Sequence, residues 1–142
     1  MIEEDFSALL ATFPETNFAF AYGSGAIEQG GYSYDKNLPA SSLPMLDLIF
    51  VVDDAKEWHK KNNVMNPTHY TTIFPLNWSK MIEYTQNLGG GIWYNTMLPI
   101  GIGKTPSRLM KYGVISSDYL IKDLTSWNAL YAAGRLHKPI RI

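Results

Sequence analysis

The sequence predicts an α+β (mixed α/β) fold, in which a mixed β-sheet is flanked by helices. Short apolar runs typical of strands share the chain with segments of helical periodicity, and the two kinds of segment do not alternate strictly. A length of 142 residues is enough for one domain with a sizeable core. The sequence contains neither an internal repeat nor a linker, so we expect a single domain over residues 1–142.

The first half of the chain contains two expected helices and two expected strands. Pro14 ends the first helix, because the residue before a proline disfavours helical backbone. Asp54 and Glu57 match a capping box and therefore start the second helix. Residues 30–44 lack periodicity and predict a long loop, of a length that is usually functional or disordered. The helices are expected over 6–13 and 55–62, and the strands over 17–22 and 45–52.

The second half contains two more helices, two more strands and a basic tail. A turn is expected at 66–70, the glycines at 89–91 end the third helix, and a second loop covers 101–107. The last helix is expected from Ser117 to a point before Gly134, with one apolar face formed by Leu120, Leu124, Trp127 and Tyr131. The remaining elements are a helix over 77–88, strands over 92–98 and 109–115, and a strand-like tail at 135–142.

The composition excludes several classes of function. With no cysteines, the chain has neither a disulfide scaffold nor thiolate chemistry. The net charge of −1 offers no basic surface to long nucleic acids, so no nucleic-acid partner is expected. The scattered histidines give no zinc signature. No apolar run approaches the ~20 residues that span a bilayer.

The most informative segment follows the first expected strand. There Tyr22, Gly23, Ser24 and Gly25 form a turn, called the glycine turn below, whose backbone N–H groups and hydroxyl are unobstructed. Such a turn suits the phosphates of a nucleoside triphosphate, although the motif alone is more often structural. Asp47 is the second signal, because a carboxylate inside an apolar strand is costly unless it is paired or coordinated. Together they predict nucleotidyl transfer.

Nucleotidyl transfer depends on groups that position phosphates and neutralise charge, and Mg²⁺ commonly contributes. Asp47 is the expected magnesium ligand. A second acid usually lies two residues further along the same strand, but Ile49 occupies that position. Asp53 has the right parity, yet it lies roughly 20 Å away along a straight strand. The second ligand is therefore left unassigned.

Lys111, Lys104 and Arg108 are the basic candidates for the phosphates. Lys111 lies in the middle of an apolar strand, where a lysine needs an anionic partner. It shares a strand face with Gly113, over which we expect a ligand to approach. A structural ion pair between Asp47 and Lys111 is the alternative, and Lys104 is more readily explained as a solvated surface residue.

Other polar and aromatic residues have ordinary structural explanations. Asp53 and Asp54 are expected to be helix caps. His59 is expected to be a half-buried surface histidine, and His69 is either a site residue or a turn cap. The tryptophans are expected in the core: Trp58, Trp78, Trp93 and Trp127.

Taken together, the motifs resemble the mitochondrial-type phosphatidate cytidylyltransferases, the CDP-diacylglycerol synthases of the translocator assembly and maintenance family. The resemblance covers nearly the whole chain and rests on short motifs in a fixed order. They are YGSG (22–25), MLDLIF (45–50), VDD (52–54), WHKKN (58–62), NPTHY (66–70), GIWYN (91–95), MKYGVIS (110–116) and LYAAGRLHKP (130–139).

The resemblance implies an enzyme that joins CTP and phosphatidic acid into CDP-diacylglycerol and pyrophosphate with Mg²⁺. It implies catalytic roles for Asp47 and Lys111, with Asp47 holding the metal. Arg135 and Lys138 would contact the lipid headgroup, although a solvated basic tail explains them nearly as well. The implied nucleotide-binding residues are Tyr22, Gly23, Ser24, Gly25, His69, Tyr70 and Asn95.

Members of this family continue well beyond residue 142. We therefore expect a truncated nucleotidyltransferase domain, without the family's helical domain and the segment that contacts the membrane surface. It is expected to bind CTP–Mg²⁺ but to make little CDP-diacylglycerol. The expected location is the bacterial cytoplasm, peripheral at the inner leaflet, with the matrix side of the mitochondrial inner membrane as the alternative. A non-catalytic assembly or lipid-binding factor, and a nucleotidyltransferase with another acceptor, remain open.

Overall fold

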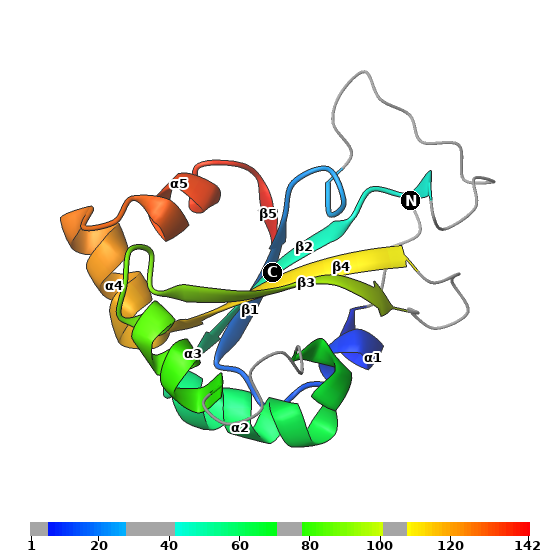
Figure 1. The fold of residues 1–142 in the computed structure, drawn as a ribbon. Coiled ribbons are helices and arrows are strands. Elements are labelled where there is room, and N and C mark those ends of the chain that lie inside the picture. Colours follow the sequence, from blue (N-terminus) through cyan, green and yellow to red (C-terminus); the bar gives the residue numbers. More distant parts are fainter. Residues whose placement is uncertain (1–5, 28–41, 71–77, 101–107) are drawn as a thin grey trace.

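A computed structural model of the chain describes residues 6–27, 42–70, 78–100 and 108–142, without the side chains of Trp78 and Ser79. The expected loop at 101–107 and most of the loop at 30–44 lie outside these residues. Within them, a five-stranded sheet is packed between helices (Figure 1), which confirms the α+β prediction. None of the helices in this part is long and apolar enough to cross a membrane.

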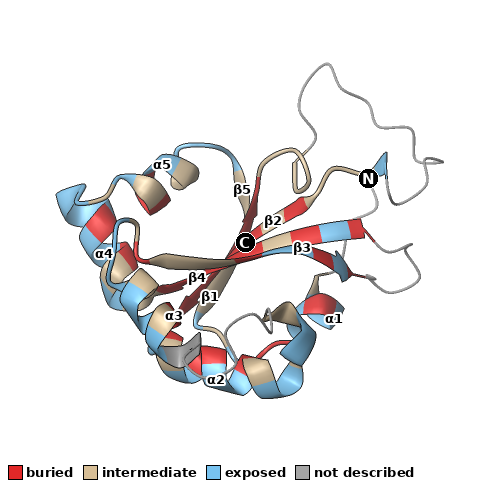
Figure 2. Cartoon of the chain, in the orientation of Figure 1, coloured by how far each residue is buried: buried red, intermediate tan, exposed pale blue. Residues whose placement is uncertain are grey.

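The strands follow the order β3-β4-β2-β1-β5 across the sheet. β2 and β4 run parallel, whereas β1 with β2, β3 with β4, and β5 with β1 pair antiparallel. β2 is buried along nearly its whole length (Figure 2), which explains its almost continuous apolar run. The strands are β1 (Phe18–Tyr22), β2 (Leu46–Val52), β3 (Ile92–Ile100), β4 (Arg108–Ser116) and β5 (Ile140–Arg141).

Helices cover both faces of the sheet. Leu9 of α1 and Trp58 of α2 belong to the apolar cluster on one face. Leu120 of α4 and Ala132 of α5 belong to the cluster on the other. Because side chains alternate along a strand, Asp47 lies on the face covered by α4 and α5. The helices are α1 (Ser7–Leu10), α2 (Ala55–Met65), the 3₁₀ helix η2 (Pro67–His69), α3 (Trp78–Gln86), α4 (Ser117–Ser126) and α5 (Tyr131–Leu136).

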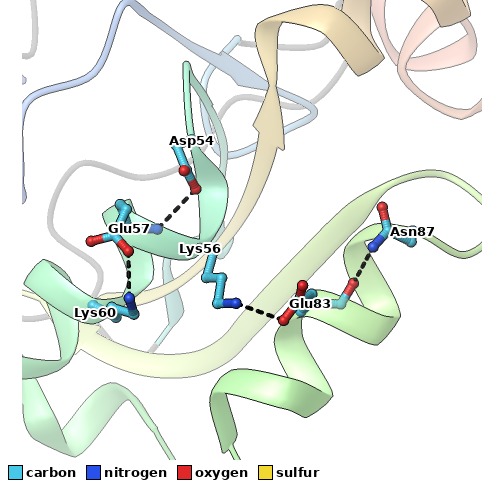
Figure 3. A network of polar contacts seen from close by, with 6 residues as sticks. All are labelled: Asp54, Lys56, Glu57, Lys60, Glu83 and Asn87. Atoms are coloured by element: carbon cyan, nitrogen blue, oxygen red, sulfur yellow. Dashed lines mark hydrogen bonds and ion pairs between the residues drawn. The ribbon is translucent and has the colours of Figure 1, made fainter.

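The start of α2 is capped as the sequence predicts. Asp54 accepts a hydrogen bond of 3.0 Å from the backbone N–H of Glu57. Next to this cap, Lys56 forms an ion pair of 2.7 Å with Glu83 of α3, and Lys60 pairs with Glu57 (Figure 3). Exposed pairs of this kind contribute little to stability. The Lys56–Glu83 pair ties α3 to α2 at the surface, outside the core, whereas the Lys60–Glu57 pair lies within α2.

The single helix expected at the C-terminal end is wrong. The chain forms α4 and α5 instead, joined by a turn in which Trp127 and Leu130 have positive φ values of 52° and 57°. Leu120 is buried as expected, but Leu124 and Trp127 are 41% and 64% exposed, so the apolar face does not extend along the segment and the core position of Trp127 is wrong. Their spacing fits a helix, but the left-handed backbone at Trp127 ends α4.

A buried aspartate holds the turn between α4 and α5. Burial raises the pKa of Asp123, but hydrogen bonds from backbone N–H groups outweigh that effect and lower the pKa. The carboxylate thereby caps the N-terminus of α5. Its donors are the N–H groups of Ala129 and Leu130 to Oδ1, at 2.8 and 2.7 Å, and of Ala132 and Ala133 to Oδ2, at 2.8 and 3.1 Å.

Candidate nucleotidyl-transfer site

Three predicted site residues lie in one row across three strands. Tyr22 of β1 is paired with Asp47 of β2, and Asp47 is paired with Lys111 of β4. Lys111 Nζ lies 2.9 Å from Asp47 Oδ1, and the two side chains are 25% and 20% exposed. The ion pair that the sequence left as an alternative therefore exists, at the end of β2 next to the glycine turn.

Asp47 helps to keep Lys111 charged. Burial lowers the pKa of Lys111, but the hydrogen bond to Asp47 and the electrostatic attraction of Tyr22 and Asp47 outweigh it, so that the pKa is raised. Lys111 Nζ also lies 5.5 Å from the centroid of the Tyr94 ring. The site thus holds a fixed positive charge at neutral pH, which is what a departing pyrophosphate requires.

The glycine turn lies beside Asp47. Gly23 has a φ of 75°, a conformation that residues with a side chain rarely adopt. A Cβ at this position would lie 3.4 Å from Asp47 Oδ2, and a Cβ at Gly25 would lie 2.1 Å from the carbonyl oxygen of Met45. Both positions therefore require glycine, Gly23 for its backbone conformation and Gly25 for the close approach of Met45, and the turn lies next to the carboxylate.

The other basic candidates differ in their surroundings. Arg108 is buried, and its Nη2 donates a hydrogen bond to the carbonyl of Gly25, so it positions the glycine turn. Lys104 lies outside the described residues. The expected approach of a ligand over Gly113 is wrong, because the Tyr94 ring fills that space. A Cβ at Gly113 would lie 2.7 Å from this ring.

Two tyrosines that border the site were not among the predicted residues. The hydroxyl of Tyr94 lies 3.5 Å from that of Tyr22, and the rings of Tyr94 and Tyr131 have centroids 6.1 Å apart. Arg135 lies 5.4 Å from the centroid of the Tyr22 ring, and Lys138 is exposed beyond α5. In the sequence, the four-residue spacing of Tyr131 and Arg135 could have indicated that the two side chains lie on one helix face.

The structure places three other predicted residues on the opposite face of the sheet. His69, Tyr70 and Asn95 converge on a buried hydroxyl, that of Tyr112. Asn95 Nδ2 lies 2.7 Å and His69 Nδ1 3.1 Å from it, and Asn62 Nδ2 bridges the hydroxyls of Tyr112 and Tyr70. The sheet therefore separates this network from the ion pair, and the assignment of its members to the nucleotide stays a prediction.

Burial lowers the pKa of His69, which favours its neutral form. The Tyr112 hydroxyl accepts hydrogen bonds from the amides of Asn62 and Asn95 and also contacts His69 Nδ1. The network ties α2, η2, β3 and β4 together behind the row of site residues.

His59 is expected to make the protein less stable in acid. It is fully buried, so the half-buried surface position that we expected is wrong. Its Nδ1 lies 2.8 Å from the Tyr70 hydroxyl, and its Nε2 has no hydrogen-bond partner within the described part of the chain. Burial lowers the pKa of His59 from 6.5 to about 3. Because the folded-state pKa lies below the unfolded one, its stabilising contribution is complete above pH 6.5 and is lost as the pH falls toward about 3.

Urea denaturation should therefore give a lower free energy of unfolding at about pH 5 than at about pH 7.5, and His59→Gln should reduce this difference. His69, whose pKa is lowered as well, accounts for the part that persists. His137→Gln, at an exposed position, is the control. An unchanged pH dependence in His59→Gln would contradict the prediction.

Asp47 is the one carboxylate that the described residues bring to the ion pair and glycine turn. Asp53 lies at the other end of β2, where it accepts a hydrogen bond from Asn17 instead of capping α2 and borders a surface cavity that contains no predicted site residue. The described residues contain no cluster of three or more histidine or acidic side chains that could hold a metal ion. Mg²⁺ is commonly bound by one or two carboxylates together with substrate phosphates. Asp47 fits the protein's share of such a site.

Comparisons with known proteins point to the same chemistry. The profile of the family described as "Phosphatidate cytidylyltransferase, mitochondrial" matches residues 6–142. Proteins of that name from Xenopus laevis and Homo sapiens are 40% and 42% identical to the chain over 138 residues, which is 96% of its length. The protein of that name from Schizosaccharomyces pombe is 37% identical over 124 residues, or 87% of the chain.

These relatives are much longer than the chain, which spans 38% of the frog protein, 28% of the human protein and 29% of the yeast protein. They are eukaryotic and are named mitochondrial, so the expected location in the bacterial cytoplasm is wrong. The profile match includes the glycine turn, Asp47, Lys111 and Arg135. The chain belongs to the family of mitochondrial-type phosphatidate cytidylyltransferases.

Proposed function

We propose that the chain forms the nucleotidyl-transfer centre of a phosphatidate cytidylyltransferase, which converts CTP and phosphatidate to CDP-diacylglycerol and pyrophosphate. The observation that carries the proposal is the ion pair of Asp47 and Lys111 directly beside the glycine turn. A carboxylate, a fixed cation and backbone N–H groups that can bind phosphates are the parts that this reaction class needs. The names of the relatives supply the base and the lipid.

Each part has a role in the displacement at the α-phosphorus of the nucleotide. The glycine turn, with Gly23 and Ser24, holds the β- and γ-phosphates against its backbone N–H groups. Asp47 holds Mg²⁺, which neutralises phosphate charge when it is bound. Lys111 stabilises the negative charge that develops on the departing pyrophosphate.

The acceptor needs no strong general base, because a phosphate monoester is already ionised near neutral pH. One of its oxygens bonds to the α-phosphorus of CTP while the bond from that phosphorus to the bridging oxygen breaks. Pyrophosphate leaves with the electron pair. The protein therefore has to orient two anions and neutralise them, for which Lys111 and the glycine turn are suited.

The place of the reaction follows from its lipid substrate. Phosphatidate is a membrane lipid and the relatives are named mitochondrial, so we place the reaction at a membrane surface in mitochondria. In this proposal His69, Tyr70 and Asn95 support the sheet from its other face, as their shared contacts with Tyr112 and Asn62 indicate.

Isothermal titration calorimetry with CTP, in the presence and absence of Mg²⁺, tests the proposal. We expect Mg²⁺-dependent binding of CTP that ATP and GTP do not reproduce. A second measurement follows labelled CTP into CDP-diacylglycerol with phosphatidate vesicles. Binding of phosphatidate without any Mg²⁺-dependent binding of CTP would overturn the proposal and favour a non-catalytic lipid-binding factor.

A further inference from the structure

Arg135 lies between two aromatic rings at the edge of the candidate site. Its guanidinium carbon is 5.4 Å from the centroid of the Tyr22 ring and 5.1 Å from that of the Tyr131 ring. Its Nη2 donates a hydrogen bond of 3.3 Å to the Tyr131 hydroxyl. Two aromatic faces and one hydroxyl therefore fix the orientation of the guanidinium, while most of its N–H donors have no partner among the described residues.

Among the residues that the structure describes, no carboxylate forms an ion pair with Arg135. Lys111 is paired with Asp47, so the Asp47, Lys111 and Arg135 group carries two cations against one carboxylate. A cation that the fold orients but leaves without a counter-ion is suited to an anionic ligand.

Hydroxyl groups add donors on the same side of the sheet. The Tyr94 hydroxyl lies 3.5 Å from that of Tyr22, and the Tyr94 and Tyr131 rings meet edge to face. Burial raises the pKa of Tyr131, but hydrogen bonds with Tyr94 and Arg135, and the charges of Arg135 and Lys111, outweigh it and lower the pKa. The Tyr131 oxygen accepts from Arg135, which leaves its proton for an acceptor such as a phosphate oxygen.

We propose that Arg135 and Tyr131 form a second phosphate subsite at the edge of the site, whose contacts add to those that the glycine turn makes. The proposal rests on the proposed function for its substrates, and it extends that function by naming Tyr131. Within the reaction, a phosphate at this position belongs either to the acceptor lipid or to the departing pyrophosphate. Both present terminal phosphate oxyanions, for which a guanidinium fork and a hydroxyl are matched donors.

Calorimetric titrations with two probes distinguish the sources: soluble short-chain phosphatidate, and inorganic pyrophosphate, each without CTP. We expect Arg135→Gln to weaken the binding of one probe about 10- to 100-fold, because a charge-assisted hydrogen bond is lost. Tyr131→Phe keeps the ring and should weaken the same probe less. Loss for phosphatidate alone assigns the subsite to the lipid, and loss for pyrophosphate alone assigns it to the leaving group.

Arg141→Gln is the matched control, because Arg141 also lies over an aromatic ring, that of Phe6 at 5.8 Å. It should bind both probes as the wild type does. Equal affinities of wild type and Arg135→Gln for both probes, or no binding of either probe by the wild type, would overturn the subsite. CTP binding is measured separately, and its failure would overturn the proposed function. Weaker probe binding by Arg135→Gln would still support the subsite in that case.

Discussion

Replacing Asp47 by Asn is expected to weaken Mg²⁺-dependent binding of CTP about 10- to 100-fold, the range that corresponds to the loss of one interaction with a charged group. The amide keeps the shape of the side chain but removes the negative charge. It therefore can neither balance Lys111, 2.9 Å away, nor serve as the carboxylate ligand of a magnesium ion. Calorimetry with CTP at fixed Mg²⁺ measures the effect.

Asp53→Asn is the matched control for this experiment. It is the same substitution in the same segment of chain, but Asp53 is exposed and follows the other end of β2. We expect it to bind CTP as the wild type does. Thermal unfolding of both variants checks that the fold is intact. If Asp47→Asn binds CTP and Mg²⁺ normally, the ion pair is only structural, as the sequence also allowed.

Replacing Asp123 by Ala is expected to lower the free energy of unfolding by about 3 kcal/mol or more, the largest stability effect that we predict. The substitution removes the acceptor of four backbone N–H groups in the turn before α5 and at its start. Because Asp123 is fully buried, water cannot readily take the place of its carboxylate as the hydrogen-bond acceptor. Urea denaturation near neutral pH measures the change.

The effect of Asp123 should also depend on pH. Its pKa is lowered in the folded state, so its contribution is present above the unfolded value of about 3.9 and is lost as the pH falls through the folded value. The difference between wild type and Asp123→Ala should therefore shrink in strong acid. Asp118→Ala, an exposed acid in the first turn of α4, is the control and should change stability little. Equal losses in both variants would contradict the prediction.

Much of the fold and the centre of the site could be predicted from local sequence. The apolar runs predicted the strands, because β2 and β4 are largely buried. Buried strands consist mainly of apolar residues, so a polar residue in one indicates a specific role. Asp47 and Lys111 stood out as the charged residues in those runs, and the structure brings them together. The cap of α2 at Asp54 was predicted for a similar reason, since its partner is close in sequence.

What could not be predicted depends on register and on backbone. Asn95 faces away from Asp47 because of how β3 pairs with β4, and this pairing shifts between Asn95 and Leu98. Asp123 escaped notice because its partners are backbone N–H groups, which every residue except proline carries and no motif reveals. The spacing of Trp127 from the preceding apolar residues fits a helix, but its backbone forms a turn. Which of the two forms depends on the surrounding hydrogen bonds, which the sequence does not reveal.

The parallel pairing of β2 with β4 has a consequence for when, during folding, the molecule becomes able to bind the nucleotide. Between Asp47 and Lys111 the chain forms α2, η2, α3 and β3 and must return to the same end of the sheet. A crossover of this length closes slowly compared with a local hairpin such as β3 with β4. We therefore expect the two charges to meet late during folding. A newly made or partly folded chain would have separate charges and no means of capturing the nucleotide.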